Sequence, residues 1–465
     1  MYKIDFNKPC RVFFIGIGGI SMSGFAEYLH INGFQVSGSD NSKNYITEHL
    51  NRIDIKVHLG QRASNISNDI DLIVYTAAIK EDNEEFIEAK RRSIPMLNRA
   101  ELIGQIMLRF DNAIAISGTH GKTTSTSMIS MILLEAKLDP TISVGGILDA
   151  INGNLRIGNS KHFVTEACEY TNSFLHFNPN RAVILNIGED HLDFFKDLND
   201  IRNSFNLFVK KIPQDGQLFI NGKIDNYEEI LNGAVCEVFT FGIHDDENQN
   251  SFDYSARNIV FDSLDNGCFD LYYKNTFIDN IKLNIIGLHN IENALPAIAM
   301  ALQMGIEVEI IKNAMLAYNG TKRRFEKKGM INGITIIDDY AHHPVEIKAT
   351  LSAAKLYEHK NDIWCVFQPH TFSRTKQHLK EFAKSLSLAD KIILADIFPA
   401  REKDPGDISS KDLARELELL DKEVYYLSSF DEIEIFLLQH CINGDLLITM
   451  GAGDIVKVGE GLLGL

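Results

Sequence analysis

The chain has 465 residues and a formal net charge of −17 at pH 7, from 46 lysines and arginines against 63 aspartates and glutamates. This acidity argues against a nucleic-acid or anionic-membrane surface, and no apolar run approaches the length of a membrane span. The chain is too long to fold around a single hydrophobic core, and its length predicts about three domains. The six cysteines lack paired spacing and the start lacks an export segment, which favours a reduced, cytoplasmic setting.

The first predicted unit is a strand, a helix and a second strand within residues 11–40. An apolar run over 11–15 precedes a glycine-rich turn, a helix to about His30 and a strand that ends at Asp40. This is most of a dinucleotide-binding fingerprint, with Ser21 in place of the third glycine. The pattern favours a nucleotide or nucleotide-sugar and leaves a nicotinamide or flavin cofactor open. The candidate binding residues are Gly16, Gly18, Gly19, Ile20, Ser21 and Asp40.

A second turn of small residues follows a strand-like run over 114–117, and Lys122 then opens a predicted helix. Backbone N–H groups and a helix N-terminus converge at such a turn, which suits a polyphosphate. Lys122 would reach the terminal phosphates, and the Thr123 hydroxyl would sit on Mg²⁺. Ile116 stands where a full Walker A pattern has glycine. The sequence therefore predicts an ATP site made of Gly118, Thr119, His120, Gly121, Lys122, Thr123 and Thr124.

Strands and helices alternate along most of the chain, which predicts an α/β fold with parallel sheets. Helix-like residues from Arg99 lead into the second turn, so we place one domain boundary near 105 and another near 320. Residues 240–280 read as antiparallel strands with loops. Further strands are expected near 333–337, 362–367, 391–396 and 445–449.

Two candidate residues follow predicted strands near the lysine-containing turn. Glu166 comes after the run 163–165, and His191 comes shortly after 183–186. Ligands in open parallel sheets bind beyond the carboxyl ends of the strands. An acid and an imidazole placed there complete a Mg²⁺ shell with Thr123 and polarise a γ-phosphate. A satisfied polar residue in a loop remains the alternative for His191.

A predicted apolar helix begins near residue 288 and carries Asn290 and Asn293 on one face. Their amides suit the edge of an adenine ring, and an ordinary N-cap is the alternative for one of them. A basic cluster over 321–325 includes Arg324 at the second domain boundary. A guanidinium there can clamp a phosphoryl group, although a charged run is often a solvated face.

Two strands of the last segment deliver histidine to what we expect to be one edge of a sheet. The run 334–337 leads to His342 and His343, and the run 364–367 leads to His370 and Arg374. This concentration favours a second part of a site. A zinc site on His342 and His343 is a weak interpretation, because adjacent side chains on an extended chain diverge.

Taken together, these motifs resemble the Mur ligase family, in the same order from Gly16 to Gly453. Mild departures are Ala341, where the family often has glycine, and Cys168, where aspartate is common. The segments that carry the resemblance are residues 16–23, 118–124, 166–169, 186–193, 289–293, 323–325, 338–344 and 367–370.

The resemblance implies three domains: a Rossmann-like UDP-sugar domain over 1–105, a central P-loop ATPase with a mostly parallel sheet over 106–320, and a Rossmann-like amino-acid-side domain over 321–465. The glycine loop after residue 15 would then bind the UDP diphosphate. Thr123, Glu166 and His191 are similar to the family's metal ligands. Asn290, Asn293 and Arg324 would serve ATP, and Tyr340, His342, His370 and Arg374 would face the substrates. The implied catalytic residues are Lys122, His191, Arg324 and His342.

The activity implied is the ATP- and Mg²⁺-dependent joining of L-alanine to the lactyl carboxylate of UDP-N-acetylmuramate, through an acyl phosphate, in peptidoglycan precursor synthesis. Small molecules would be the only partners, and the protein would be a monomer or a weak homodimer whose third domain closes during the reaction. A recycling ligase that attaches a tripeptide to the same UDP-sugar is one alternative. A nicotinamide-dependent oxidoreductase is an alternative from a different class.

Overall fold

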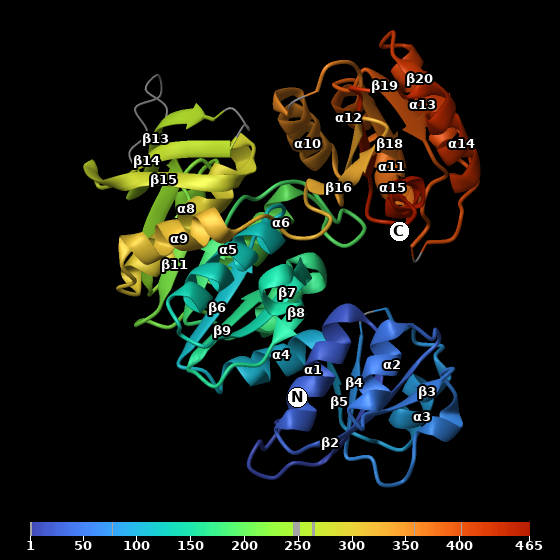
Figure 1. The fold of residues 1–465 in the computed structure, drawn as a ribbon. Coiled ribbons are helices and arrows are strands. Elements are labelled where there is room, and N and C mark those ends of the chain that lie inside the picture. The colour runs from blue at the N-terminus through green and yellow to red at the C-terminus, as the bar shows by residue number, and fades with distance from the viewer. Residues whose placement is uncertain (1, 77, 245–251, 263–265, 358, 401) are drawn as a thin grey trace. The chain divides into compact units, whose positions relative to one another are not determined.

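The computed structural model describes residues 2–76, 78–244, 252–262, 266–357, 359–400 and 402–465. It divides into two compact units, one of Met1–Ser255 with Leu295–Ile311, and one of Ala256–Ala294 with Lys312–Leu465. Three sheets, each with helices, make up the fold (Figure 1), which confirms the predicted α/β class. No helix in the described part of the chain is long and apolar enough to cross a membrane.

The first sheet is wholly parallel in the order β3-β2-β1-β4-β5. Its central strand β1 is apolar and buried over Val12–Ile15, as expected of a strand covered on both faces. The strand order reverses between β1 and β4, the kind of place where such sheets bind ligands. The elements are β1 (Arg11–Ile15), α1 (Ile20–Ile31), β2 (Gln35–Asp40), α2 (Tyr45–Arg52), β3 (Lys56–Leu59), β4 (Leu72–Tyr75), α3 (Glu84–Arg91), β5 (Met96–Asn98) and α4 (Arg99–Met107).

Over the described residues, the central sheet is mixed and has ten strands in the order β15-β14-β13-β12-β11-β10-β6-β9-β7-β8. Strand β6 is buried along its whole length and pairs in parallel with β9 and β10, so the ends of these three strands are neighbours. The elements up to β12 are β6 (Asn112–Ser117), α5 (Lys122–Glu135), β7 (Thr141–Leu148), β8 (Gly153–Arg156), β9 (His162–Glu166), a 3₁₀ segment (Tyr170–His176), β10 (Arg181–Ile184), α6 (Leu198–Val209), β11 (Gln217–Asn221), α7 (Tyr227–Ile230) and β12 (Glu237–Ile243).

The expectation of antiparallel strands over 240–280 is confirmed for β14 and β15, which form a long antiparallel pair. Residues 245–251 and 263–265 of that stretch lie outside the described residues. The elements here are β13 (Tyr254–Phe261), β14 (Asn266–Tyr273), β15 (Thr276–Ile286), α8 (Leu288–Gln303) and α9 (Val308–Ala317).

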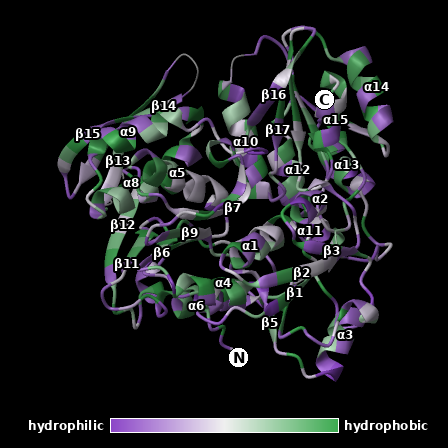
Figure 2. Ribbon diagram, turned by 60° about the horizontal axis from the view of Figure 1, so that its bottom comes forward, coloured by the Kyte–Doolittle hydropathy of each residue, from purple (hydrophilic) through white to green (hydrophobic). Residues whose placement is uncertain are grey.

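The last sheet has the order β16-β17-β21-β18-β19-β20, parallel except for the edge strand β16. The four strands expected here are confirmed as β17, β18, β19 and β21. Helices such as α3 and α14 carry both hydrophilic and hydrophobic residues (Figure 2), as helices that cover one face of a sheet do. The elements are β16 (Glu326–Ile331), β17 (Ile334–Asp339), α10 (Pro344–Leu356), β18 (Ile363–Phe367), α11 (Phe372–Gln377), α12 (Leu379–Leu386), β19 (Lys391–Leu394), α13 (Ser410–Glu418), β20 (Glu423–Tyr426), α14 (Phe430–His440), β21 (Leu446–Met450) and α15 (Val456–Leu463).

Candidate nucleotide and substrate sites

The turn between β6 and α5 depends on two glycines with positive φ. Gly118 has a φ of +139° and Gly121 has a φ of +84°, conformations that L side chains rarely adopt. A Cβ atom on Gly118 would also lie 2.9 Å from the Cβ of Leu185 and 3.1 Å from the backbone nitrogen of Asn186. The loop therefore packs directly on the end of β10. Lys122 is the first residue of α5, as the sequence predicts.

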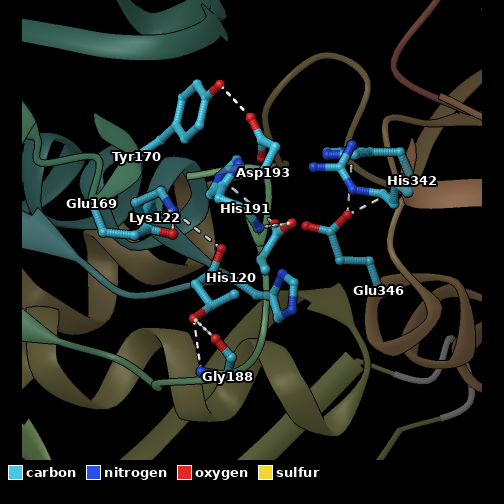
Figure 3. Close-up of polar contacts among 12 residues, drawn as sticks. His120, Lys122, Glu169, Tyr170, Gly188, His191, Asp193, His342 and Glu346 are labelled. Carbon is cyan, nitrogen blue, oxygen red and sulfur yellow. Dashed lines mark hydrogen bonds and ion pairs between the residues drawn. The ribbon is translucent and has the colours of Figure 1, made fainter. Parts of the chain in front are cut away.

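Lys122 folds back over this loop (Figure 3). Its Nζ donates to the carbonyl oxygens of Gly118 and Thr119, the latter at 3.1 Å, and lies 3.1 Å from the Oε2 of Glu169. Glu169 is 2 % exposed. Burial opposes the charge on Lys122, but Glu169, together with Cys168 and Glu166, raises the pKa of Lys122 above its ordinary value. The lysine is thus a fixed cation at the end of β6.

Asn186, two residues after β10, holds the first half of the loop. Its Oδ1 accepts the backbone N–H of His120 at 2.8 Å, and its Nδ2 donates to the carbonyl of His120 at 3.1 Å. The backbone N–H of Thr119 donates to the Asn186 carbonyl at 3.2 Å. The Thr119 hydroxyl accepts the N–H of Gly188 at 2.9 Å. Sequence reasoning assigned roles to neither Asn186 nor Glu169, although both lie within the motifs it singled out.

Glu166 ends β9 beside the loop. It pairs in register with Ile116 on β6, and one of its carboxylate oxygens accepts the backbone N–H of Gly145. Thr123, the second residue of α5, is 7 % exposed. The structure therefore places the acid and the hydroxyl at the ends of adjacent elements. Among the described residues, no three His, Cys, Asp or Glu side chains are grouped so that they could hold a metal ion.

His191 lies on the segment that follows β10, with a φ of +55°. Its ring stacks on Tyr170 with centroids 4.3 Å apart, and its Nε2 lies 3.7 Å from the Oδ2 of Asp190. Tyr170 in turn donates its hydroxyl to Asp193 at 2.7 Å (Figure 3). The imidazole is held by stacking and by a carboxylate.

The glycine loop after β1 is closed by Asp40. The backbone N–H of Gly18 donates to the Oδ2 of Asp40 at 2.9 Å, where a Cβ on Gly18 would come within 2.8 Å of that oxygen. Asp40 therefore supports the loop, whereas the acid of a dinucleotide fingerprint binds a ribose hydroxyl. Gly16 has a φ of +81°.

The start of α1 is held by two residues that sequence reasoning missed. Arg99 Nη1 donates to the Ser21 hydroxyl at 2.9 Å, and Asn154 Nδ2 donates to the carbonyl of Ile20 at 3.1 Å. These contacts join residues 78 and 134 positions apart, so no local pattern marks them.

The two asparagines of α8 form a pair, as their spacing predicts. Nδ2 of Asn293 donates to Oδ1 of Asn290 at 3.3 Å, and Nδ2 of Asn290 donates to the carbonyl of Ile286 at 2.7 Å. Asn290 lies inside the first turn of the helix, which begins at Leu288, so the N-cap alternative is wrong for it.

The two arginines of the basic cluster differ in their surroundings. Arg323 Nε donates to the Oδ2 of the fully buried Asp338 at 3.1 Å, and its Nη2 donates to the Gly451 carbonyl at 2.7 Å. The Arg324 guanidinium lies 5.3 Å from the ring centroid of Tyr340. Burial raises the pKa of Asp339 to about 6, although Arg324 lowers it in part. Arg323 is therefore a structural cation, whereas Arg324 lies beside Tyr340 and Asp339.

The strand ends of the last sheet bring His342 and His370 together. Their ring centroids are 5.5 Å apart, and His370 Nδ1 lies 3.2 Å from Arg374 Nη1. His342 Nδ1 lies 3.4 Å from Glu346 (Figure 3). His343 instead packs against His378, with centroids 5.0 Å apart, so the two adjacent histidines diverge as expected.

A glycine turn lies between a parallel strand and a helix that begins with a lysine. An acid ends one neighbouring strand and an imidazole lies on the segment after the other, which is typical of α/β proteins that bind a nucleoside triphosphate. Three family models match the chain. They are the Mur ligase family catalytic domain over residues 11–111, the Mur ligase middle domain over 116–301 and the Mur ligase glutamate ligase domain over 323–453.

Relatives and solved structures agree with these matches. The UDP-N-acetylmuramate–L-alanine ligases of Lachnoclostridium phytofermentans and Lachnospira eligens are 58% and 57% identical to the chain, over 100% of both sequences in each case. The crystal structure of UDP-N-acetylmuramate-alanine ligase MurC from Thermotoga maritima has a TM-score of 0.82 at 27% identity, with 98% of each chain covered. A murein peptide ligase from Psychrobacter arcticus has a TM-score of 0.74 at 25% identity, also over 98% of each chain.

The chain belongs to the Mur ligase family. Membership makes it an ATP-dependent ligase, and a nicotinamide-dependent oxidoreductase is thereby ruled out as its class.

Proposed function

We propose that the protein joins L-alanine to the lactyl carboxylate of UDP-N-acetylmuramate at the expense of ATP, which yields ADP and phosphate, in peptidoglycan precursor synthesis. The main support is the 58% identity, over the full length of both sequences, to a relative named UDP-N-acetylmuramate–L-alanine ligase. The phosphate loop of the chain also contains Gly121, Lys122 and Thr123. The geometry of the loop supports it, because Lys122 is a partly buried cation that Glu169 and two loop carbonyls hold in place.

In the first step the γ-phosphoryl group of ATP passes to the lactyl carboxylate and forms an acyl phosphate. A carboxylate is a poor electrophile, so this activation is necessary before an amine can attack. Lys122 and the N–H groups at the start of α5 would hold the phosphates and spread the developing negative charge. The UDP-sugar would lie at the loop after β1, where Gly16, Gly18, Gly19, Ile20 and Ser21 are proposed to meet its diphosphate. Asp40 is proposed to hold this loop through the N–H of Gly18.

We also propose Mg²⁺ as the metal. The hydroxyl oxygen of Thr123 and the carboxylate of Glu166 are hard oxygen ligands of the kind Mg²⁺ prefers, and His191 is the proposed residue for a second ion. An ion held by these residues would supply charge neutralisation. These residues fit the ion, because Glu166 and Thr123 end and begin elements that flank the same loop.

In the second step the amine of L-alanine attacks the acyl phosphate, and the tetrahedral intermediate expels phosphate. No covalent enzyme intermediate is needed, so the chain's contribution is position and charge. We assign Asn290 and Asn293 to adenine and Arg324 to the transferring phosphoryl group. Tyr340, His342, His370 and Arg374 are assigned to the substrate side, where three of the side chains already form one cluster.

The domain organisation is proposed as 1–105 for the UDP-sugar, 106–320 for ATP and 321–465 for the amino-acid side. The three matched models, over 11–111, 116–301 and 323–453, support it. We propose a cytoplasmic protein, and a monomer or weak homodimer.

The recycling activity is the second candidate within the family, and the relatives do not favour it. A murein peptide ligase is only 25% identical, against 58% for an alanine ligase. Specificity for alanine over glycine rests on one methyl group, worth about 1–3 kcal/mol, so slow use of glycine or serine is expected.

An omission assay tests the proposal. Purified protein is incubated with UDP-N-acetylmuramate, ATP, Mg²⁺ and L-alanine, each left out in turn, while phosphate release and product mass are followed. Alanine-dependent phosphate release with a product heavier by one alanine residue supports the proposal. Turnover with L-alanyl-γ-D-glutamyl-meso-diaminopimelate in place of alanine would transfer the assignment to recycling, and no turnover with either would overturn both.

A further inference from the structure

The side chain of Asn186 makes a two-point contact with the backbone of the phosphate loop. Its Oδ1 accepts from the N–H of His120 at 2.8 Å and its Nδ2 donates to the carbonyl of the same residue at 3.1 Å. A side-chain amide has one acceptor group and one donor group. In Asn186 the acceptor binds the peptide unit before His120 and the donor binds the peptide unit after it. A carboxylate has no donor, and a hydroxyl offers its donor and acceptor from a single atom, so neither reproduces these two separate contacts.

This contact sorts the N–H groups of the loop into two sets. Those of Thr119 and His120 are turned toward Asn186, one to its carbonyl oxygen and one to its side chain. Those at the start of α5, from Gly121 to Thr123, have no acceptor within the helix because they belong to its first turn. Asn186 thus fixes which part of the loop faces a phosphate.

The same short segment also carries His191. Gly188 bonds to the Thr119 hydroxyl at 2.9 Å, so the chain from Asn186 to Gly188 is tied to the loop at two residues. His191 follows three residues later, with its ring stacked on Tyr170. Lys122 follows the loop, whereas His191 lies on the segment after β10. If the loop moved away from the end of β10, the distance between Lys122 and His191 would therefore change.

From this geometry we propose that Asn186 is a positioning residue, which holds the phosphate loop and the His191 segment in the mutual arrangement that phosphoryl transfer requires. This role rests on the proposed function for the identity of the reaction, but not for the binding of ATP. Asn186 acts through the backbone of His120 and through the segment that leads to His191.

Three substitutions test the role. Asn186→Ala removes both contacts. Asn186→Asp keeps the acceptor for the His120 N–H but sets a carboxylate oxygen against the His120 carbonyl. Asn221→Ala is the matched control, because Asn221 is a buried asparagine at the end of the adjacent parallel strand β11 and its side chain accepts the nearby N–H of Lys223 at 2.9 Å. Kd for ATP with Mg²⁺ is measured by calorimetry, KM and kcat by phosphate release, and Tm by calorimetry.

We expect Asn186→Ala and Asn186→Asp to weaken ATP binding about tenfold and to lower kcat further, since each leaves a loop backbone group unpaired. KM for the UDP-sugar should stay within about twofold of wild type, and Asn221→Ala should leave Kd for ATP unchanged. If Asn186 only supported the fold, its replacement would lower Tm and weaken the binding of both substrates alike. That result would overturn the role, and so would wild-type ATP affinity in both Asn186 variants. If the wild type binds ATP but releases no phosphate with alanine, the proposed function fails, while the effect of Asn186 on ATP binding still decides this inference.

Discussion

The ammonium of Lys122 lies 3.1 Å from the carboxylate of Glu169, which is 2 % exposed. The lysine of a phosphate loop is thus already paired with a buried acid of its own chain. Two loop carbonyls occupy further ammonium protons. A terminal phosphate that binds Lys122 must therefore share it with, or take it from, these partners.

Replacement of Lys122 by alanine is expected to lower kcat by about a thousandfold, because no other residue of the loop supplies a positive charge to the phosphates. Phosphate release under saturating substrates measures the effect. Lys211→Ala, an exposed lysine after α6, is the control and should leave the rate unchanged. Near-normal phosphate release from the Lys122 variant would remove the lysine from the mechanism.

Replacement of Glu169 by glutamine is expected to cost about 3 kcal/mol of unfolding free energy, because it leaves the partly buried ammonium of Lys122 without its counter-charge. Urea denaturation measures the cost. The double variant with Lys122→Ala should lose less than the sum of the two single variants, since one interaction is removed in both. Additive losses would show that the two side chains do not depend on each other.

Replacement of Arg324 by alanine is expected to lower kcat about a hundredfold and to change the affinity for the UDP-sugar little. Arg323→Ala is an informative neighbour, because Arg323 is bonded to the fully buried Asp338 and its loss should lower stability by about 3 kcal/mol. Kinetics and thermal unfolding of both variants separate the two roles. Equal losses of rate and of UDP-sugar affinity for Arg324→Ala would indicate a structural arginine.

Asp339 makes stability depend on pH in the acid range. Burial raises its pKa from an ordinary 3.8 to about 6, against a partial opposing effect of Arg324. The folded state therefore keeps a proton that the unfolded state has released, so this contribution to stability is full below pH 3.8 and is lost as the pH rises through about 6. Unfolding free energies between pH 4 and 6 measure it.

The variant Asp339→Asn cannot titrate at this position. Between pH 4 and 6, its unfolding free energy should therefore fall by about 2 kcal/mol less than that of the wild type. It also gives up one acceptor, since the aspartate accepts from the N–H groups of Phe325 and Ala341 at 2.8 and 2.7 Å. The slope against pH is therefore the informative quantity. Parallel curves for wild type and variant would contradict the shifted pKa.

Much of the fold was predictable because it depends on local pattern. The runs before Gly16 and Gly118 are apolar and end in glycines with positive φ, and both became buried strands with tight turns. The edge strands β16 and β20 were not predicted. Their sequences, over Glu326–Ile331 and Glu423–Tyr426, carry charged residues and lack the fully buried pattern of inner strands.

The residues of the candidate site were likewise predictable only in part. Lys122 could be identified from its neighbours in sequence, whereas the residues that hold it in place could not. Asn186 contacts His120 across 66 positions, and Glu169 contacts Lys122 across 47. Such pairs are created by the parallel register of β6, β9 and β10 and not by any spacing along the chain.

His191 occupies a left-handed backbone conformation, with a φ of +55°, that glycine adopts at no steric cost. A glycine at this position would relieve about 1 kcal/mol of local strain and remove the imidazole proposed for the second ion. Selection for heat resistance alone would therefore favour a change that selection for turnover rejects.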